Sequence, residues 1–256
     1  MLEGLRAAGF DVATRNHAEA ILAFDFPEEL GGLVAALLSF RIGLEEVIGG
    51  GGGESGQTQR LRHALAEAGW RKHKFSVQVI VDGREREAIS HEVDHVRFAP
   101  QGGLALEIEW NNKDPFFDRD LENFQRLHAI SAISLGVIVT RGRSMQEALL
   151  PRIRGWMESR GLASEDDLDR LGISERTAAQ RRAVAGQVAR GAGFAEAFAR
   201  KFVADKFGAA TTHWAKLEER ISRGVGNPCP LLLIGLPESV LADAIPRPDP
   251  EPDLFG

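Results

Sequence analysis

Three acidic residues lie at a spacing that is typical of a divalent metal site. The segment Leu104–Asn112 alternates between apolar and polar side chains, the two-residue period of a β-strand, and places Glu107 and Glu109 on one face. Asp94 belongs to an earlier strand-like run, and residues 99–103 between the two runs are typical of a turn. A hairpin formed by these runs would bring the three carboxylates together, and such a set suits a hard, oxygen-seeking cation.

The same acids also fit a solvated strand face with no metal ion, and the pattern alone leaves this alternative open. Glu92 shares its expected strand face with Asp94 and is a possible auxiliary ligand, although an exposed strand glutamate is the commoner case. His73 is a second auxiliary candidate, in a basic run that could contact phosphate or simply lead into a strand. His91 and His95 flank Asp94, but strand alternation predicts that they point away from it.

Asp94 and Glu107-Ile108-Glu109 resemble the catalytic core of the PD-(D/E)xK nuclease superfamily. More narrowly, they resemble type II restriction endonucleases of the BglII and BamHI kind, in which Gln or Glu replaces the usual lysine. Further similarity to the BglII kind lies in Asn16–Leu22, Trp70–Lys72 and Val137–Gly142. The resemblance is patchy and reaches to about residue 145, with nothing recognisable beyond it.

The resemblance implies a site-specific endonuclease that uses Mg²⁺, with Mn²⁺ expected to substitute, and cuts both strands of a short palindrome in double-stranded DNA. It also implies a homodimer and a cognate DNA methyltransferase in the host. Asp94 and Glu107 would hold the cation, with the Ile108 carbonyl as a further ligand. Glu109 stands where the superfamily usually has lysine, as a base or a second-metal ligand, and Lys113 is a rival for the lysine role.

Two other functions remain as alternatives to a restriction enzyme. One is a repair or phage-type nuclease on the same fold that recognises DNA structure, and the other is a non-catalytic DNA-binding protein. The intact acids Asp94, Glu107 and Glu109 count against the second alternative, because mutually repelling carboxylates have no reason to persist without a role.

Base recognition is expected immediately after the acidic strand. The candidate residues are Asn111, Asn112, Lys113 and Arg119. Asparagine can make a bidentate contact with adenine, and lysine or arginine can contact guanine in the major groove. The alternative is that the two asparagines only form a turn, which asparagine does well.

Composition restricts the class of protein. The chain has 256 residues, of which 43% are hydrophobic, so it can bury a sizeable core. One cysteine excludes a disulfide framework and a cysteine zinc site. A net charge of −6 argues against a non-specific DNA-coating protein but not against a nuclease.

The start lacks the apolar core of a signal peptide and no run is long enough to span a membrane, so a bacterial cytoplasmic location is expected.

The elements expected to position the acids form an α/β fold, with a central mixed β-sheet flanked by helices, like that of restriction endonucleases, and an additional helical C-terminal region. Before the acids, Glu28–Val47 is predicted as one apolar helix, and strands at 74–81 and 85–90 turn at Asp82-Gly83. After them we expect a helix begun by Asp114-Pro115, a buried strand, and a helix opened by a capping box at Ser144, over residues 114–132, 134–140 and 144–156.

Four regions are predicted along the chain. Residues 1–150 form the nuclease core, and 151–226 form a helical, arginine-rich region packed on it. Residues 227–245 return a late strand to the core, and the proline-rich, acidic tail 246–256 is expected to be disordered. Short helices within the arginine-rich region have a weak helix-turn-helix spacing, and a solvated basic helix face is at least as good an explanation.

Overall fold

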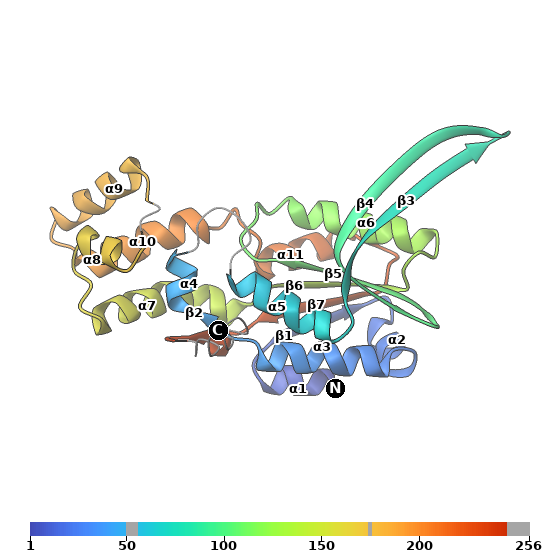
Figure 1. Ribbon diagram of the computed structural model, residues 1–256, viewed down its shortest axis with the longest axis horizontal. Coiled ribbons are helices and arrows are strands. Elements are labelled where there is room, and N and C mark those ends of the chain that lie inside the picture. The colour runs from blue at the N-terminus through green and yellow to red at the C-terminus, as the bar shows by residue number, and fades with distance from the viewer. Residues whose placement is uncertain (50–55, 174–175, 245–256) are drawn as a thin grey trace, which may run out of the picture.

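A computed structural model of the chain describes residues 1–49, 56–173 and 176–244, so the expected disordered tail at 246–256 lies outside the described residues. The centre of the molecule is a six-stranded sheet in the order β1-β7-β6-β5-β4-β3 (Figure 1). Its strands are β1 Asp11–Arg15, β3 Arg71–Val81, β4 Arg84–Ala99, β5 Gly102–Glu109, β6 Leu135–Arg141 and β7 Leu231–Leu236. β5, β6 and β7 are parallel and the other neighbours are antiparallel, which confirms the predicted mixed sheet.

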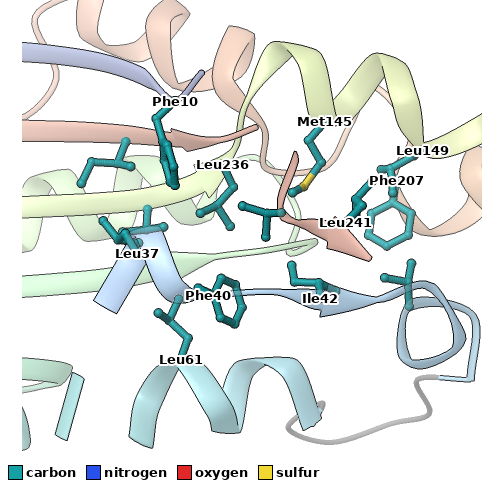
Figure 2. Packing of buried hydrophobic residues seen from close by; sticks show 14 of the residues in the cluster. Phe10, Leu37, Phe40, Ile42, Leu61, Met145, Leu149, Phe207, Leu236 and Leu241 are labelled. Carbon is teal, nitrogen blue, oxygen red and sulfur yellow. The ribbon is translucent and has the colours of Figure 1, made fainter. Parts of the chain in front are cut away.

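Helices cover both faces of this sheet and create two apolar clusters. The first cluster contains Leu104 and Leu106 of β5, and Figure 2 shows its packing around Phe40 and Leu236. It is built largely from α1 Leu2–Ala7, α2 Ala18–Phe24, α3 Pro27–Ser39, α4 Leu44–Gly49, α5 Gly56–Glu67 and α7 Arg143–Ser159. The second cluster contains Ala105 of β5 and is covered by α6 Phe116–Ala129 and α11 Trp214–Ser222. Because β5 packs on both faces, polar side chains on its second face are enclosed by protein.

The hairpin of β3 and β4 projects from the body of the molecule as a long twisted ribbon (Figure 1). Its turn is at Asp82-Gly83, as predicted, and both residues have positive φ, 52° and 74°, which a two-residue hairpin turn of this kind requires. The two strand-like runs expected at 85–90 and 91–98 form the single strand β4.

The region after α7 is helical, as predicted. It contains α8 Glu165–Arg170, α9 Ala178–Val188 and α10 Phe194–Lys206. Many of its arginines are paired with acids of the same chain, at contacts such as Arg176–Asp169 (2.7 Å) and Arg181–Asp169 (3.2 Å). These pairs indicate that the arginines hold the helices together. They argue against the alternative of a solvated basic helix face. The division of the chain into separate regions remains a prediction, and α7 itself runs across residue 150.

Three local predictions are wrong, each because a distant segment competes with the local signal. The single helix predicted over Glu28–Val47 is interrupted by the short strand β2 Ile42–Gly43. This strand pairs with β8 Leu241–Ala242, which follows the 3₁₀ turn Glu238–Val240. The helix predicted to open with a capping box at Ser144 begins at Arg143. Its first N–H is bound by the Asp11 carboxylate at 2.8 Å.

The third correction concerns the start of α6. Asp114 does not cap this helix, which begins at Phe116, because its carboxylate pairs with Arg220 of α11 at 3.0 Å. Among the described residues, no helix combines the length and apolar character that a bilayer crossing requires.

Candidate active site

A β-bulge positions Asp94. Arg71 of β3 pairs with Val96 of β4, and His73 pairs with Val93, so that Lys72 alone faces both Asp94 and His95. A bulge bends the strand and redirects side chains, and bulges are common beside active sites. Val93 and Val96 both enter the second apolar cluster although they are three positions apart, which regular alternation forbids. Asp94 is exposed, whereas the neighbouring His95 is buried, and both residues line one groove.

Glu107 and Glu109 are at the end of β5, on the same face as Ala105, as strand alternation predicts. This face is covered, and the two side chains are only 5% and 3% exposed. A solvated face is therefore not the explanation for these two acids. They lie at the carboxyl end of three parallel strands, where open α/β sheets characteristically place their ligands.

Asp120 is a fourth acid that the sequence analysis missed. It lies on α6, it is fully buried, and it is close enough to Glu109 to raise the pKa of that carboxyl group. A signal was present in the sequence, because Asp120 falls at helical spacing within the apolar stripe formed by Phe117, Leu121 and Phe124. An acid in an otherwise buried stripe needs a partner or a ligand.

The acids strongly perturb one another. Burial, followed by the charges of Asp120, Asp94 and Glu109, raises the pKa of Glu107 to about 9. Burial and Asp120 raise the pKa of Glu109 to about 8, and burial raises the pKa of Asp120 as well. In the absence of a cation, this cluster therefore retains protons at neutral pH that ordinary carboxyl groups release.

Two of the predicted base-reading residues contact the acids. Arg119 donates to Asp120 at 2.8 Å and lies 3.5 Å from Glu109, while Asn112 donates to Glu109 at 2.8 Å. Arg119 also lies over the ring of Phe116, with its guanidinium carbon 4.3 Å from the ring centroid. The structure thus places these side chains beside the catalytic candidates, and their contact with bases remains a prediction.

The other predicted site residues lie apart from the acids. Asn111 is exposed in the turn after β5, and the backbone of Lys113 forms an isolated bridge with Thr211. The carboxylate of Glu92 pairs with Lys72 at 2.6 Å. The imidazole of His73 packs edge-on against two phenylalanine rings, with centroid distances of 4.6 and 5.1 Å. Neither Glu92 nor His73 is brought into the buried acid cluster.

His91 lies closer to the acids than strand alternation predicted. Burial lowers its pKa, and the charges of Asp120 and Arg119 act on it in opposite directions. The imidazole is half-buried on β4, beside the covered face that holds Glu107. No pattern in the sequence distinguished it from the other histidines of the hairpin.

The acids fit a magnesium ion held partly by the protein. Within the described ranges, no three His, Cys, Asp or Glu side chains are grouped closely enough to enclose a metal ion by themselves. Mg²⁺ is characteristically bound through one or two carboxylates, with waters and substrate phosphates completing its shell. Asp120 Oδ2 is buried without a hydrogen-bond partner in the described structure, so it offers an unused acceptor beside Glu109. Asp94, Glu107 and Glu109 would supply the remaining carboxylates.

A family model described as restriction endonuclease BglII/BglIII matches residues 10–236. The match spans all strands of the six-stranded sheet, and it extends well past residue 145, where the resemblance in sequence motifs ended. A search among curated proteins gave no significant match.

The raised pKa of Glu107 predicts how stability depends on pH. Native Glu107 keeps its proton up to about pH 9, whereas the unfolded group releases it near its ordinary value of 4.5, so folding stability falls as pH rises between these values. Glu107→Gln removes this loss. We expect the Tm of the variant in EDTA to exceed that of the wild type by several degrees at pH 8.5, given about 2–4 °C per kcal/mol for a chain of this size, and by much less at pH 5.

Thermal unfolding followed by circular dichroism at the two pH values measures the difference. Glu122→Gln, a matched substitution of an exposed acid on α6, should leave Tm nearly unchanged at both. A gain for Glu107→Gln that is the same at pH 5 and pH 8.5 would contradict the assignment of a buried, proton-retaining carboxyl group.

Proposed function

This chain belongs to the BglII/BglIII family of restriction endonucleases, and from that premise we propose that it is a Mg²⁺-dependent type II enzyme that cleaves both strands of a short palindrome in duplex DNA. The observation that carries the proposal is the buried pair Glu107 and Glu109 beside Asp94 at the carboxyl end of β5. Burying these repelling acids costs stability, and a cation held by their carboxylates would offset that cost.

The proposed roles of the acids follow from their positions. A bound Mg²⁺ polarises the scissile phosphate and lowers the pKa of the attacking water. Asp94 approaches from the exposed side, where the bulge directs it to the groove, while Glu107 approaches from the buried side. Both would hold the cation, with the Ile108 carbonyl as a further ligand. Mn²⁺, which also prefers oxygen ligands, is expected to substitute.

Glu109 is the proposed replacement for the lysine of related nucleases. Its carboxylate accepts a hydrogen bond from Asn112 and faces Arg119 and Asp120, so its orientation is fixed from two elements. A carboxyl group with a pKa of about 8 is a stronger base than an ordinary glutamate. In this position Glu109 would accept a proton from water or hold a second cation.

The assembly and the cellular context are also proposed. One active site cuts one strand, and a palindrome mirrors two-fold protein symmetry, so the working form would be a homodimer. The host would need a cognate DNA methyltransferase to protect its own sites. Both proteins would act in the bacterial cytoplasm, where the DNA is.

The first functional prediction concerns the metal ligands. Asp94→Ala and Glu107→Ala should each abolish cleavage of plasmid DNA in Mg²⁺ while DNA binding survives, because each change removes a ligand and also a negative charge that repels phosphate. Agarose gels give the cleavage and fluorescence anisotropy gives the binding. Glu122→Ala is the control, and cleavage by either site variant at a near wild-type rate would show that the assignment is wrong.

The second prediction separates Glu109 from Lys113. If Glu109 fills the lysine role, Glu109→Ala should be nearly inactive, whereas Lys113→Ala should lose mainly affinity, because Lys113 is exposed and paired through its backbone to Thr211. Single-turnover cleavage at saturating enzyme distinguishes a loss of rate from a loss of binding. An inactive Lys113→Ala beside an active Glu109→Ala would transfer the role to the lysine.

The third prediction concerns specificity. Asn112→Ala and Arg119→Ala should each reduce discrimination between the cognate site and a site with one changed base pair by about 1–3 kcal/mol. Their binding to unrelated DNA should change far less. The control is Arg126→Ala, an exposed arginine further along α6. Equal losses on cognate and random duplexes would make Asn112 and Arg119 structural supports of Glu109 and Asp120 instead of base contacts.

A further inference from the structure

A groove of about 630 Å³ runs beside Asp94, and its lining residues do not include the buried acids. One wall is the exposed side of α5, and the other is the start of β3, with the bulged residues of β4 between them. Its lining residues include Arg62, His63, Arg71, Lys72 and Asp94. The volume is within the range of about 300–1,000 Å³ that is typical of ligand pockets, which is the scale of one or two nucleotides.

The groove is basic in a chain that is acidic as a whole. Arg62, Arg71 and Lys72 carry positive charges, against the negative charges of Asp94 and of Glu92, which pairs with Lys72, while the net charge of the chain is −6. A local reversal of sign next to a catalytic candidate concentrates anionic ligands at that point. The lining is also rich in side-chain donors, which suit phosphate oxygens.

The C-terminal end of α5 fixes the position of one wall relative to the other. Gly69 has φ of +87°, its N–H donates to Ala66, and the N–H of Trp70 donates to Leu65. This pair of bonds is a Schellman motif, and Trp70 and Leu65 pack in the same apolar cluster. Arg71 is fixed in turn, because its guanidinium donates to the carbonyls of Ala66 and Trp70. The basic walls therefore form a rigid surface.

From this geometry we infer that the groove between α5 and β3 binds the sugar-phosphate backbone of the cleaved strand, next to the phosphate that Asp94 approaches. The inference rests on the proposed function and adds the path of the strand to it. Arg62 and Lys72 contact phosphates from opposite walls and position the strand, without selecting its sequence. Glu92 partly neutralises Lys72 when DNA is absent, with 2.6 Å between the charged atoms.

The test is the salt dependence of DNA binding. Binding of a short duplex of random sequence is measured by anisotropy in Ca²⁺ and in EDTA, from about 50 to 200 mM salt, for Arg62→Ala, Lys72→Ala and the double variant. Each lost phosphate contact should make the slope of log K against log salt concentration shallower by about 0.9. Cognate and random duplexes should be affected alike.

Lys201→Ala and Arg200→Ala are the matched controls. Lys201 pairs with Asp205 at 2.6 Å, as Lys72 does with Glu92, and Arg200 is, like Arg62, an exposed helical arginine, on α10. Their slopes should equal that of the wild type. Glu92→Gln tests the opposite direction, because releasing Lys72 should tighten binding at low salt, and a folding defect cannot produce that gain.

The outcomes separate the inference from the proposed function. If the wild type cleaves DNA but the slopes of Arg62→Ala and Lys72→Ala match those of the controls, the backbone does not run through the groove and the nuclease proposal stands. If the wild type neither binds nor cleaves duplex DNA under any of these conditions, both fail. Shallower slopes for the groove variants alone support the inference.

Discussion

The structure of this site depends on the burial of carboxyl groups that repel one another. Glu107, Glu109 and Asp120 are enclosed between β5 and α6, and the cation that directly contacts this group, Arg119, is itself half exposed. Removing charges from water costs several kcal/mol per ion unless they are paired. Without a cation the acids take up protons, as their raised pKa values show. Under the proposed function, a divalent ion would replace these protons and offset the repulsion between the acids.

The sheet and its covering helix contribute different parts of this arrangement. β5 supplies two acids on one face by simple alternation, and α6 supplies Asp120 and Arg119 from adjacent positions of one helical turn. The bulge in β4 supplies Asp94 from the exposed side. One departure from regular pairing is therefore enough to let a strand pack its valines on the core and still present a carboxylate to a groove.

The acids of the hairpin could be predicted from the sequence because their arrangement is local. Strand alternation places Glu107 and Glu109 together whatever surrounds them, and the short turn between Ala99 and Gly102 joins β4 to β5. The role of Asp120 could not be predicted in the same way, since it depends on which sheet face α6 covers. The bulge at Asp94 likewise depends on pairing with β3.

The wrong predictions of helix and strand boundaries also arise from contacts with distant segments of the chain. Asp11 binds the first N–H of α7 across 132 positions of the chain, so no local capping signal was needed at Ser144. β2 exists because β8 pairs with it, and the local sequence there continues an apolar helical pattern. Local chemistry specifies an element well where its own neighbours stabilise it, and poorly where a distant partner does.

The distribution of charge explains how an acidic protein can act on DNA. The arginines of α7 to α10 are largely engaged with acids of the same region, so they add little to the outward field. Basic side chains line the groove beside Asp94, and the buried acids near it keep their protons when no cation is bound. Under the proposed function, a cation bound by the acids removes the repulsion that would oppose a phosphate, while the groove attracts the neighbouring phosphates. Metal and DNA would then each strengthen the binding of the other, because both act on the same electrostatic imbalance.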